Sequence, residues 1–232
     1  MQNETLVISL GGSMIVPEEI DVEFLKEFKE LILSHVTLGK RFLIVTGGGR
    51  TCRKYQNAAK EIVDASKEDL DWIGLTVNNV NAQLVRVIFG KYSCDKAYYD
   101  LGDIGIKDSI KEYPIVIGGA LEPGHSSDFD AVLAAKNIGA KKIINLSNID
   151  HVYDSDPKIN PDAKKIEEIS WADYRNIIPK EWTHAGLNSP FDPIASKLAD
   201  EEGMQVMIMN GKPIENLAKY LNDEEFIGTK IS

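Results

Sequence analysis

Cysteine is scarce in this sequence, and no apolar run is long enough to cross a bilayer. Cys52 and Cys94 lie far apart and match no metal-binding spacing, so a reducing, cytoplasmic setting is the simplest expectation. Residues 1–4 lead directly into an apolar segment, and we therefore expect no signal peptide. Cys52 precedes Arg53, whose positive charge would activate a neighbouring thiol. The favoured interpretation of Cys52 is nevertheless a small buried side chain that fills space.

Positive charge is scarce as well. The 232 residues include 36 acidic and 26 basic side chains, which gives a formal net charge of −10. Proteins that bind nucleic acids or anionic membranes need a broad basic surface, so both classes of partner are disfavoured. Small phosphorylated ligands need only a few local cations. The length and the 43% hydrophobic content suit a globular α/β protein with a sizeable core.

Two common nucleotide-binding motifs are absent, Gly-x-x-x-x-Gly-Lys-Ser/Thr and Gly-x-Gly-x-x-Gly. P-loop and dinucleotide-binding folds are therefore weak interpretations. The most informative segment is instead a glycine triplet at 47–49, which follows an apolar run at 42–46 and precedes Arg50, Arg53 and Lys54.

This triplet predicts a binding site for phosphate. Glycine lets backbone amides approach a ligand, and a helix that begins just after the triplet would direct its unpaired N–H groups at the same point. Arginine can grip phosphate oxygens in a fork. A tight turn with a solvated basic face is the alternative for this segment alone. Two further apolar segments, 6–10 and 114–117, also end in glycine pairs, and this repetition favours a site for several phosphates.

Apolar segments of strand length alternate with segments of helical periodicity. We predict strands at 6–10, 42–45, 114–117, 142–147 and 205–210, a short edge strand at 227–231, and helices at 21–33, 51–63, 67–89, 128–137, 193–199 and 214–221. Residues 92–111 are predicted as a shorter strand-and-helix segment, and 161–182 as a loose segment that covers the site. This alternation predicts an α/β fold with a mostly parallel central sheet covered by helices on both faces.

Several polar side chains allow two interpretations each. Asp71 lies near the start of a predicted helix, where it either complements the helix dipole, the favoured interpretation, or bonds a pair of sugar hydroxyls. His125 is either a catalytic base or, more commonly, a loop histidine that bonds backbone. Asp150, Asp154 and Asp156 suggest a metal loop but lack the glycine and terminal glutamate of a calcium-binding EF-hand loop, so turn-forming carboxylates are favoured.

Five segments together resemble the amino-acid kinase superfamily, and within it the uridylate (UMP) kinases of archaeal type. They are residues 9–13, 47–49 with Arg53, 71–74, 123–128 and 147–157. Each segment is short, but their order is specific to the superfamily, and the resemblance covers nearly the whole chain. It implies a three-layer sandwich and one amino-acid kinase domain over residues 1–232. Within it, residues 1–118 mainly hold the acceptor nucleotide and residues 119–232 mainly hold ATP.

The resemblance implies in-line transfer of the γ-phosphoryl group of ATP to UMP, with Mg²⁺, in a homo-oligomer that is usually hexameric in the family. The residues implied to be catalytic are Arg53, Asp128, Gly11 and Gly12. Those implied to bind ATP are Ser9, Leu10, Gly11, Gly12, Ser13, Gly49, Arg53, Ser147, Asn148, Tyr153 and Asp156. Those implied to bind UMP are Gly48, Asp71, Leu121, Glu122, Pro123, Gly124, His125, Ser126 and Ser127. No metal ligand is expected from the protein.

The sequence departs from the family pattern in three places. Ser9 stands where bacterial UMP kinases carry lysine, which archaeal UMP kinases also lack, so positive charge must come from Mg²⁺ and Arg53, with Lys197 as a further candidate. His151 stands where the family usually has glycine, and it would be strained if that position needs a positive φ. The loop between residues 119 and 128 is about one residue longer than the archaeal pattern, which leaves uracil specificity open.

Two alternatives therefore stand beside UMP kinase. One is a sister kinase that phosphorylates another small carboxylate or phosphate. The other is a non-catalytic nucleotide- or anion-binding protein on the same fold.

Overall fold

The computed structural model describes residues 5–157, 159–180 and 189–232. Its central element is a seven-stranded sheet with the order β3-β2-β1-β4-β8-β9-β7. The strands are β1 (Thr5–Leu10), β2 (Arg41–Thr46), β3 (Ile115–Gly118), β4 (Lys142–Ser147), β7 (Glu168–Ile169), β8 (Gln205–Asn210) and β9 (Thr229–Ile231). A separate antiparallel pair is formed by β5 (Val152–Tyr153) and β6 (Lys165–Ile166).

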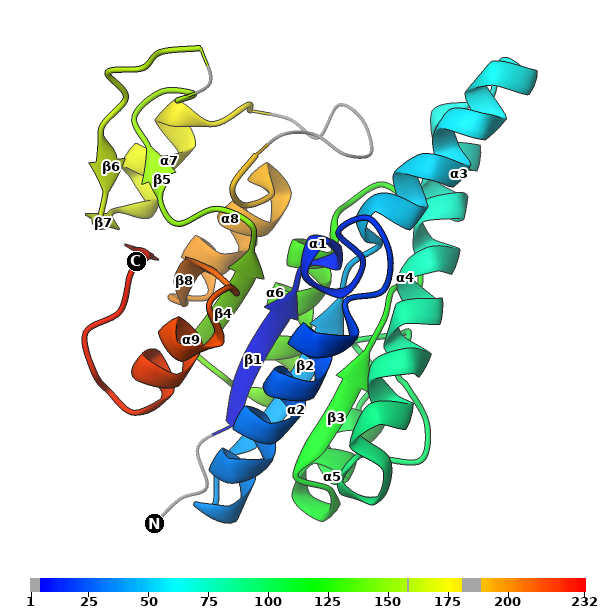
Figure 1. The fold of residues 1–232 in the computed structure, drawn as a ribbon, viewed down its shortest axis with the longest axis vertical. Helices are drawn as coiled ribbons and strands as arrows, with labels where there is room; N and C mark the ends of the chain where they lie inside the picture. Colours follow the sequence, from blue (N-terminus) through cyan, green and yellow to red (C-terminus); the bar gives the residue numbers. More distant parts are fainter. Residues whose placement is uncertain (1–4, 158, 181–188) are drawn as a thin grey trace.

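Helices connect the strands and cover both faces of the sheet (Figure 1). They are α1 (Gly12–Ile15), α2 (Val22–Thr37), α3 (Gly49–Ile62), α4 (Lys67–Phe89), α5 (Gly105–Glu112), α6 (Ser127–Ile138), α7 (Trp171–Ile177), α8 (Pro193–Glu201) and α9 (Ile214–Leu221), with a short 3₁₀ turn at Gly90–Tyr92. Crossover helices such as α2 make neighbouring strands parallel, and the pair of β8 with β9 is the one antiparallel pair described in the seven-stranded sheet.

Alternation along the strands divides the core into two layers, because successive side chains of a strand point to opposite faces. On β1, Val7 belongs to the apolar cluster that includes α5, α6, α7 and α8, whereas Leu6 and Ile8 belong to the cluster that includes α1, α2, α4 and α9. In the second cluster Phe28 is almost fully buried and its ring contacts those of Phe24 and Phe89. The predicted three-layer α/β sandwich is thus confirmed.

The predicted elements are confirmed over most of the chain, and three segments differ. Residues 92–111 form an isolated bridge at Ser93, another at Tyr98, and α5, but no full strand. The segment expected to be loose contains β6, β7 and α7. The prediction of an edge strand at 227–231 was wrong in one respect: β9 pairs with β8 on one side and with β7 on the other, so it is not the edge. In the described part of the chain, no helix combines the length and apolar character that a membrane span needs.

The topology fixes where a ligand can bind. The chain builds β1, β2 and β3 in one direction across the sheet and then crosses to the other side of β1 to add β4. In open α/β sheets the carboxyl ends of the strands beside such a reversal form a crevice. Figure 1 shows α1 and the start of α3 at this end of the sheet, while the far end of α3 projects beyond it together with the start of α4.

Candidate active site

A cavity of about 510 Å³ lies at the carboxyl ends of β1 and β2. Many of the residues predicted to bind phosphate or the acceptor line this cavity. They are Gly12, Ser13, Gly48, Gly49, Arg53, Asp71, Glu122, Pro123, His125, Ser126, Ser127, Asp128 and Asn148. The structure therefore brings together segments that are more than a hundred residues apart in the sequence.

Two glycine turns pack against each other at backbone distance in this cavity. A Cβ atom placed on Gly12 would lie 1.9 Å from the amide nitrogen of Gly49, and one placed on Gly49 would lie 2.2 Å from the carbonyl oxygen of Gly12. Gly49 also has a φ of +67°, a conformation that other residues rarely adopt. Glycine at both positions lets the ends of β1 and β2 approach each other more closely than any side chain would allow.

The amides of these turns are available to a ligand. Those of Gly12, Ser13, Gly48 and Gly49 have no hydrogen-bond partner among the described residues. The amide of Gly11, in contrast, donates to the Leu146 carbonyl oxygen (2.9 Å) and is not free to bind phosphate.

Helix α3 begins at Gly49, the last glycine of the triplet, with Gly48 as its N-cap, and it adds the positive end of its dipole. Of the three basic residues that follow, only Arg53 lines the cavity, and its guanidinium has no hydrogen bond or ion pair with another described side chain. Arg50 pairs with Glu18 (2.8 Å) and Lys54 with Glu19 (3.4 Å), away from the cavity. The expectation of three mobile cations at this helix is thus reduced to one.

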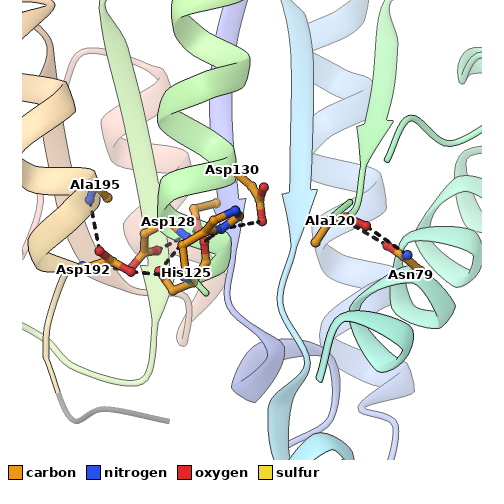
Figure 2. A network of polar contacts seen from close by, with 9 residues as sticks. Asn79, Ala120, His125, Asp128, Asp130, Asp192 and Ala195 are labelled. Atoms are coloured by element: carbon orange, nitrogen blue, oxygen red, sulfur yellow. Dashed lines mark hydrogen bonds and ion pairs between the residues drawn. The ribbon is translucent and has the colours of Figure 1, made fainter. Parts of the chain in front are cut away.

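The third glycine pair has a different role from the one expected. A Cβ atom on Gly119 would lie 2.2 Å from the Asn79 side-chain oxygen. The Asn79 side chain in turn donates to the Ala120 carbonyl oxygen (3.0 Å) and accepts from its amide (2.9 Å), as Figure 2 shows. This turn is therefore a packing contact between β3 and α4, and only Ala120 of these residues lines the cavity.

A network of hydrogen bonds holds the carboxylate of Asp128 at the base of the cavity. Its Oδ1 accepts from Ser9 Oγ (3.1 Å) and Asn145 Nδ2 (2.7 Å), and its Oδ2 accepts from the amide of Asp192 (3.3 Å). The amide of Asp128 itself donates to Ser126 Oγ, the N-cap of α6. These contacts tie β1, β4, α6 and α8 to one carboxylate.

Asp192 is the N-cap of α8, and its oxygens accept from the amides of Ile194 (2.6 Å), Ala195 (3.0 Å) and Ser126 (3.1 Å). Figure 2 shows Asp192, Asp128, Asp130 and His125 grouped at the start of α6. His125 Nδ1 lies 3.8 Å from an Asp130 oxygen and 3.3 Å from the Ser126 carbonyl oxygen. The backbone contact predicted for His125 is present. The ring also contacts that of Phe129 in a tilted arrangement, with 4.4 Å between the ring centroids.

Burial changes the acidity of this group. Burial and, after it, the nearby charge of Asp192 raise the pKa of Asp128 to about 7, and the hydrogen bonds from Ser9, the Asp192 amide and Asn145 oppose this rise. Burial and the charges of Asp128 and Asp192 also raise the pKa of Asp130 well above its usual value. Like charges in a buried group oppose one another, so Asp128 and Asp130 both bind a proton more readily than an ordinary aspartate does.

Asp71, Gln56 and Cys52 form part of the opposite wall of the cavity. Burial raises the pKa of Asp71, and Lys67, the Gly124 amide and His125 partly offset this. Gln56 is buried and donates to the Leu70 carbonyl oxygen (2.8 Å). Burial likewise raises the pKa of the Cys52 thiol, which agrees with the interpretation of Cys52 as a filler and not as an activated nucleophile.

A second cavity of about 290 Å³ adjoins the first, and Asn148 and Ser189 line both. All of the predicted ATP-binding residues of the later segment line it, namely Ser147, Asn148, Tyr153 and Asp156. Its walls are largely apolar, with Ile149, Val152, Pro157, Ile177, Ile178, Pro179 and Pro190. His151 also lines it. Among the described non-glycine residues only Asp223 has a positive φ, so His151 is not strained as it would be if its position required glycine.

Some predicted site residues do not line either cavity. They are Ser9, Leu10, Gly11, Leu121 and Gly124. Ser9 contacts the site through its hydrogen bond to Asp128, which does line the cavity, and Leu10 is fully buried in the core. Lys197, considered as a substitute for the missing lysine, is exposed and lines neither cavity.

Two residues of the site were missed from the sequence, Asn145 and Asp192. Each carried a signal. Asn145 interrupts an otherwise apolar strand, and a polar side chain there must find a buried partner. Asp192 precedes Pro193, a pair typical of a helix N-terminus.

The described residues contain no group of three or more His, Cys, Asp or Glu side chains that suits a metal ion. Asp128 and Asp192 nevertheless both line the larger cavity. One or two carboxylates beside phosphate oxygens are the usual ligands of Mg²⁺. The donor set therefore fits a Mg²⁺ ion that is bound mainly by a nucleotide.

Comparison with known proteins agrees with this geometry. A model of the amino acid kinase family matches residues 4–210. The chain belongs to the amino acid kinase family. This confirms the family resemblance and the fold predicted from the sequence.

Similar members of the amino acid kinase family are named uridylate kinases. The chain is 33% identical to the one from Methanobrevibacter smithii over 97% of this chain and 98% of that protein, and 31% identical to the one from Methanococcus aeolicus over 94% and 95%. The crystal structure of the uridylate kinase from Archaeoglobus fulgidus superimposes with a TM-score of 0.81 at 31% identity, covering 98% of this chain and 99% of that one.

The raised pKa of Asp128 predicts a pH-dependent stability. Because this carboxyl has an ordinary pKa of 3.8 and one of about 7 in the fold, the folded state binds more protons than the unfolded state between these values. The stability that protonated Asp128 contributes is complete below pH 4 and is lost as the pH rises to about 7. In denaturant unfolding from pH 4.5 to 8, we expect Asp128→Asn to gain on the order of 3 kcal/mol relative to wild type.

The matched control is Asp64→Asn, which changes an exposed carboxylate at the far end of α3. Its stability should follow that of the wild type at every pH. If Asp128→Asn did the same, apart from a constant offset, the carboxyl would not be held protonated by the fold.

Proposed function

We propose that this protein is a UMP kinase, which transfers the γ-phosphoryl group of ATP directly to the phosphate of UMP and forms UDP. The observation that carries the proposal is the pair of adjoining cavities, which share Asn148 and Ser189. The unpartnered amides of Gly12 and Gly49 and the Arg53 side chain belong to the larger of the two. Two nucleotides placed end to end in these cavities would meet with their phosphates at this point.

The larger cavity suits the acceptor. Asp71 on α4 faces the loop that contains Glu122 and His125, and a carboxylate there can accept from both hydroxyls of a ribose. Arg53 is one turn along α3 from the glycine triplet, where a guanidinium can bind two phosphate oxygens at once. A carboxylate acceptor would leave the ribose partner unused, so Asp71 favours a nucleoside monophosphate.

The smaller cavity suits the base of the donor nucleotide. Its apolar residues offer flat contact surface, and Tyr153 and Asp156 lie beside them. The strands of residues 5–118 lie on one side of the sheet and those after residue 119 on the other. This supports the predicted division into an acceptor half and an ATP half.

The chemistry needs alignment and charge stabilisation more than a reactive side chain. The phosphoryl group passes through a loose transition state, and the phosphate acceptor is already anionic, so no general base is required. The free amides and Arg53 would neutralise charge on the transferred group. Asp128 and Asp192 would help to hold a Mg²⁺ ion together with the nucleotide, and the ion would supply positive charge to the phosphates. Asp128 would also orient the site through Ser9, the residue that replaces the family lysine.

Cytoplasmic location and a homo-oligomer, as in the resembled family, stay predictions. Both cysteines are unpaired in the described structure, which suits a reducing compartment.

An acceptor screen tests the proposal. With ATP and Mg²⁺ present, release of ADP is followed with UMP, CMP, acetylglutamate or carbamate as acceptor. We expect the highest kcat/KM with UMP. Turnover with a carboxylate alone would instead identify a sister kinase, and nucleotide binding without any turnover would identify a non-catalytic binding protein.

Arg53→Ala tests how the transferred phosphate is held. Because Arg53 is the one basic residue of its helix turn that reaches the cavity, its loss should lower kcat for UDP formation about 100-fold or more and leave the unfolding temperature unchanged. Arg50→Ala is the control, since Arg50 pairs with Glu18 on the surface, and its activity should stay within about twofold of wild type. Equal effects of the two substitutions would contradict the assigned role.

A further inference from the structure

Two buried polar atoms beside the smaller cavity have no partner. Among the described residues, Ser147 Oγ and His151 Nδ1 are buried and make no hydrogen bond, and both residues line this cavity. His151 is 7% exposed. A buried polar atom without a partner costs on the order of 1–3 kcal/mol. In the described part of the chain, His35 Nδ1, Ser93 Oγ and Arg175 Nη1 are also buried without a partner, but none of these residues lines a described cavity, whereas Ser147 and His151 both lie where a ligand could supply the partner.

Both neighbours of His151 in the sequence are hydrogen-bonded to other parts of the fold. The side chain of Asn210 donates to Asp150 Oδ1 (3.0 Å), and the amide of Val152 donates to Thr229 Oγ1 (2.8 Å). Residues 152–153 also pair with β6. The imidazole is therefore attached to a segment whose position is restrained. Such restraint suits a residue that recognises a ligand by one directed hydrogen bond.

The surroundings of the imidazole indicate which part of a ligand it meets. Ile149, Ile177, Ile178 and Pro157 give the cavity apolar walls, which suit a planar ring and exclude a phosphate. A neutral imidazole offers one donor and one acceptor nitrogen, and a half-turn of the ring about its Cβ–Cγ bond exchanges Nδ1 with a carbon position. A purine edge offers complementary donors and acceptors.

We propose that His151 determines specificity for the base of the donor nucleotide. Its imidazole makes a hydrogen bond to this base, and Ser147 Oγ makes a second hydrogen bond beside it. This inference rests on the proposed function, since it assigns the smaller cavity to the donor. It gives a physical reason for a histidine at a position where the resembled family usually has glycine. A left-handed backbone at this position would strain a histidine. His151 instead supplies a polar atom that has no partner in the unliganded cavity.

Two substitutions of similar size separate the hydrogen bond from the packing. His151→Leu keeps the volume and removes the polar atoms, whereas His151→Gln keeps an amide that can donate and accept. With UMP saturating, we expect His151→Leu to raise KM for ATP about tenfold, the equivalent of one hydrogen bond, while kcat and KM for UMP change by less than about twofold. His151→Gln should recover most of this loss. The preference for ATP over GTP, as a ratio of kcat/KM values, should fall in the leucine variant.

The unliganded proteins supply a second readout. Because Nδ1 has no partner in the empty cavity, His151→Leu should unfold at the same temperature as the wild type or at a higher one. A lower unfolding temperature together with an equal loss in the leucine and glutamine variants would show that His151 only fills space. An unchanged KM for ATP in the leucine variant would overturn the proposal as well.

Calorimetric titration with ADP keeps this test separate from the proposed function. If the wild type formed no UDP but bound ADP, the kinase proposal would fail, and the comparison of the leucine and glutamine variants would still decide the role of His151. If ADP bound with equal affinity to all three proteins, the inference about His151 would fail while the kinase proposal stood.

Discussion

The backbone contact between Gly12 and Gly49 is the constraint on which the site depends. Two strands that are neighbours in a sheet normally carry side chains at their ends, and these side chains would keep the following turns apart. Here a Cβ atom on either glycine would overlap backbone atoms of the other turn. The close approach places unpartnered amides from both turns in one cavity, and a site made of amides can hold the phosphates of either nucleotide.

The carboxylate of Asp128 connects this cavity to the rest of the sheet. It is bonded from β1, β4 and the start of α8, so a shift in any of these elements changes its position. Its burial beside Asp192 raises its pKa to about 7, which means that its charge depends on what enters the cavity. A bound cation would favour the ionised form, and an empty site favours the protonated form. Asp128 thus couples the state of the ligand site to the electrostatics of the core.

Most of the fold and the position of the site were predictable from the sequence, because periodicity and glycine-ended strands are local signals. The helix at 67–89 is an example, because the bounds predicted from its apolar spacing agree with those of α4. The edge position assigned to 227–231 was wrong, because the pairing of β7 with β9 depends on long-range contacts that no local pattern records.

The chemistry of individual side chains was harder to predict. The glycine pair at 118–119 has the same sequence pattern as the phosphate-binding turns, yet it packs on Asn79, and only the placement of α4 reveals this. Arg50, Arg53 and Lys54 look equivalent in the sequence, but in the structure Arg50 and Lys54 pair with Glu18 and Glu19, and only Arg53 lines the cavity. Asn145 and Asp192 carried usable signals, but their importance follows from the carboxylate that they both contact.

The central claim is that the two cavities form one continuous site in which phosphates meet end to end. Calorimetric titration with adenosine and uridine joined through five phosphates tests it most directly. We expect one molecule to bind per chain, at least about 100-fold more tightly than ADP or UMP alone, because both halves are held at once. If the linked compound bound no more tightly than ADP, the cavities would not hold the two nucleotides in line. The same would follow if the bound compound left the affinity of the protein for UMP unchanged.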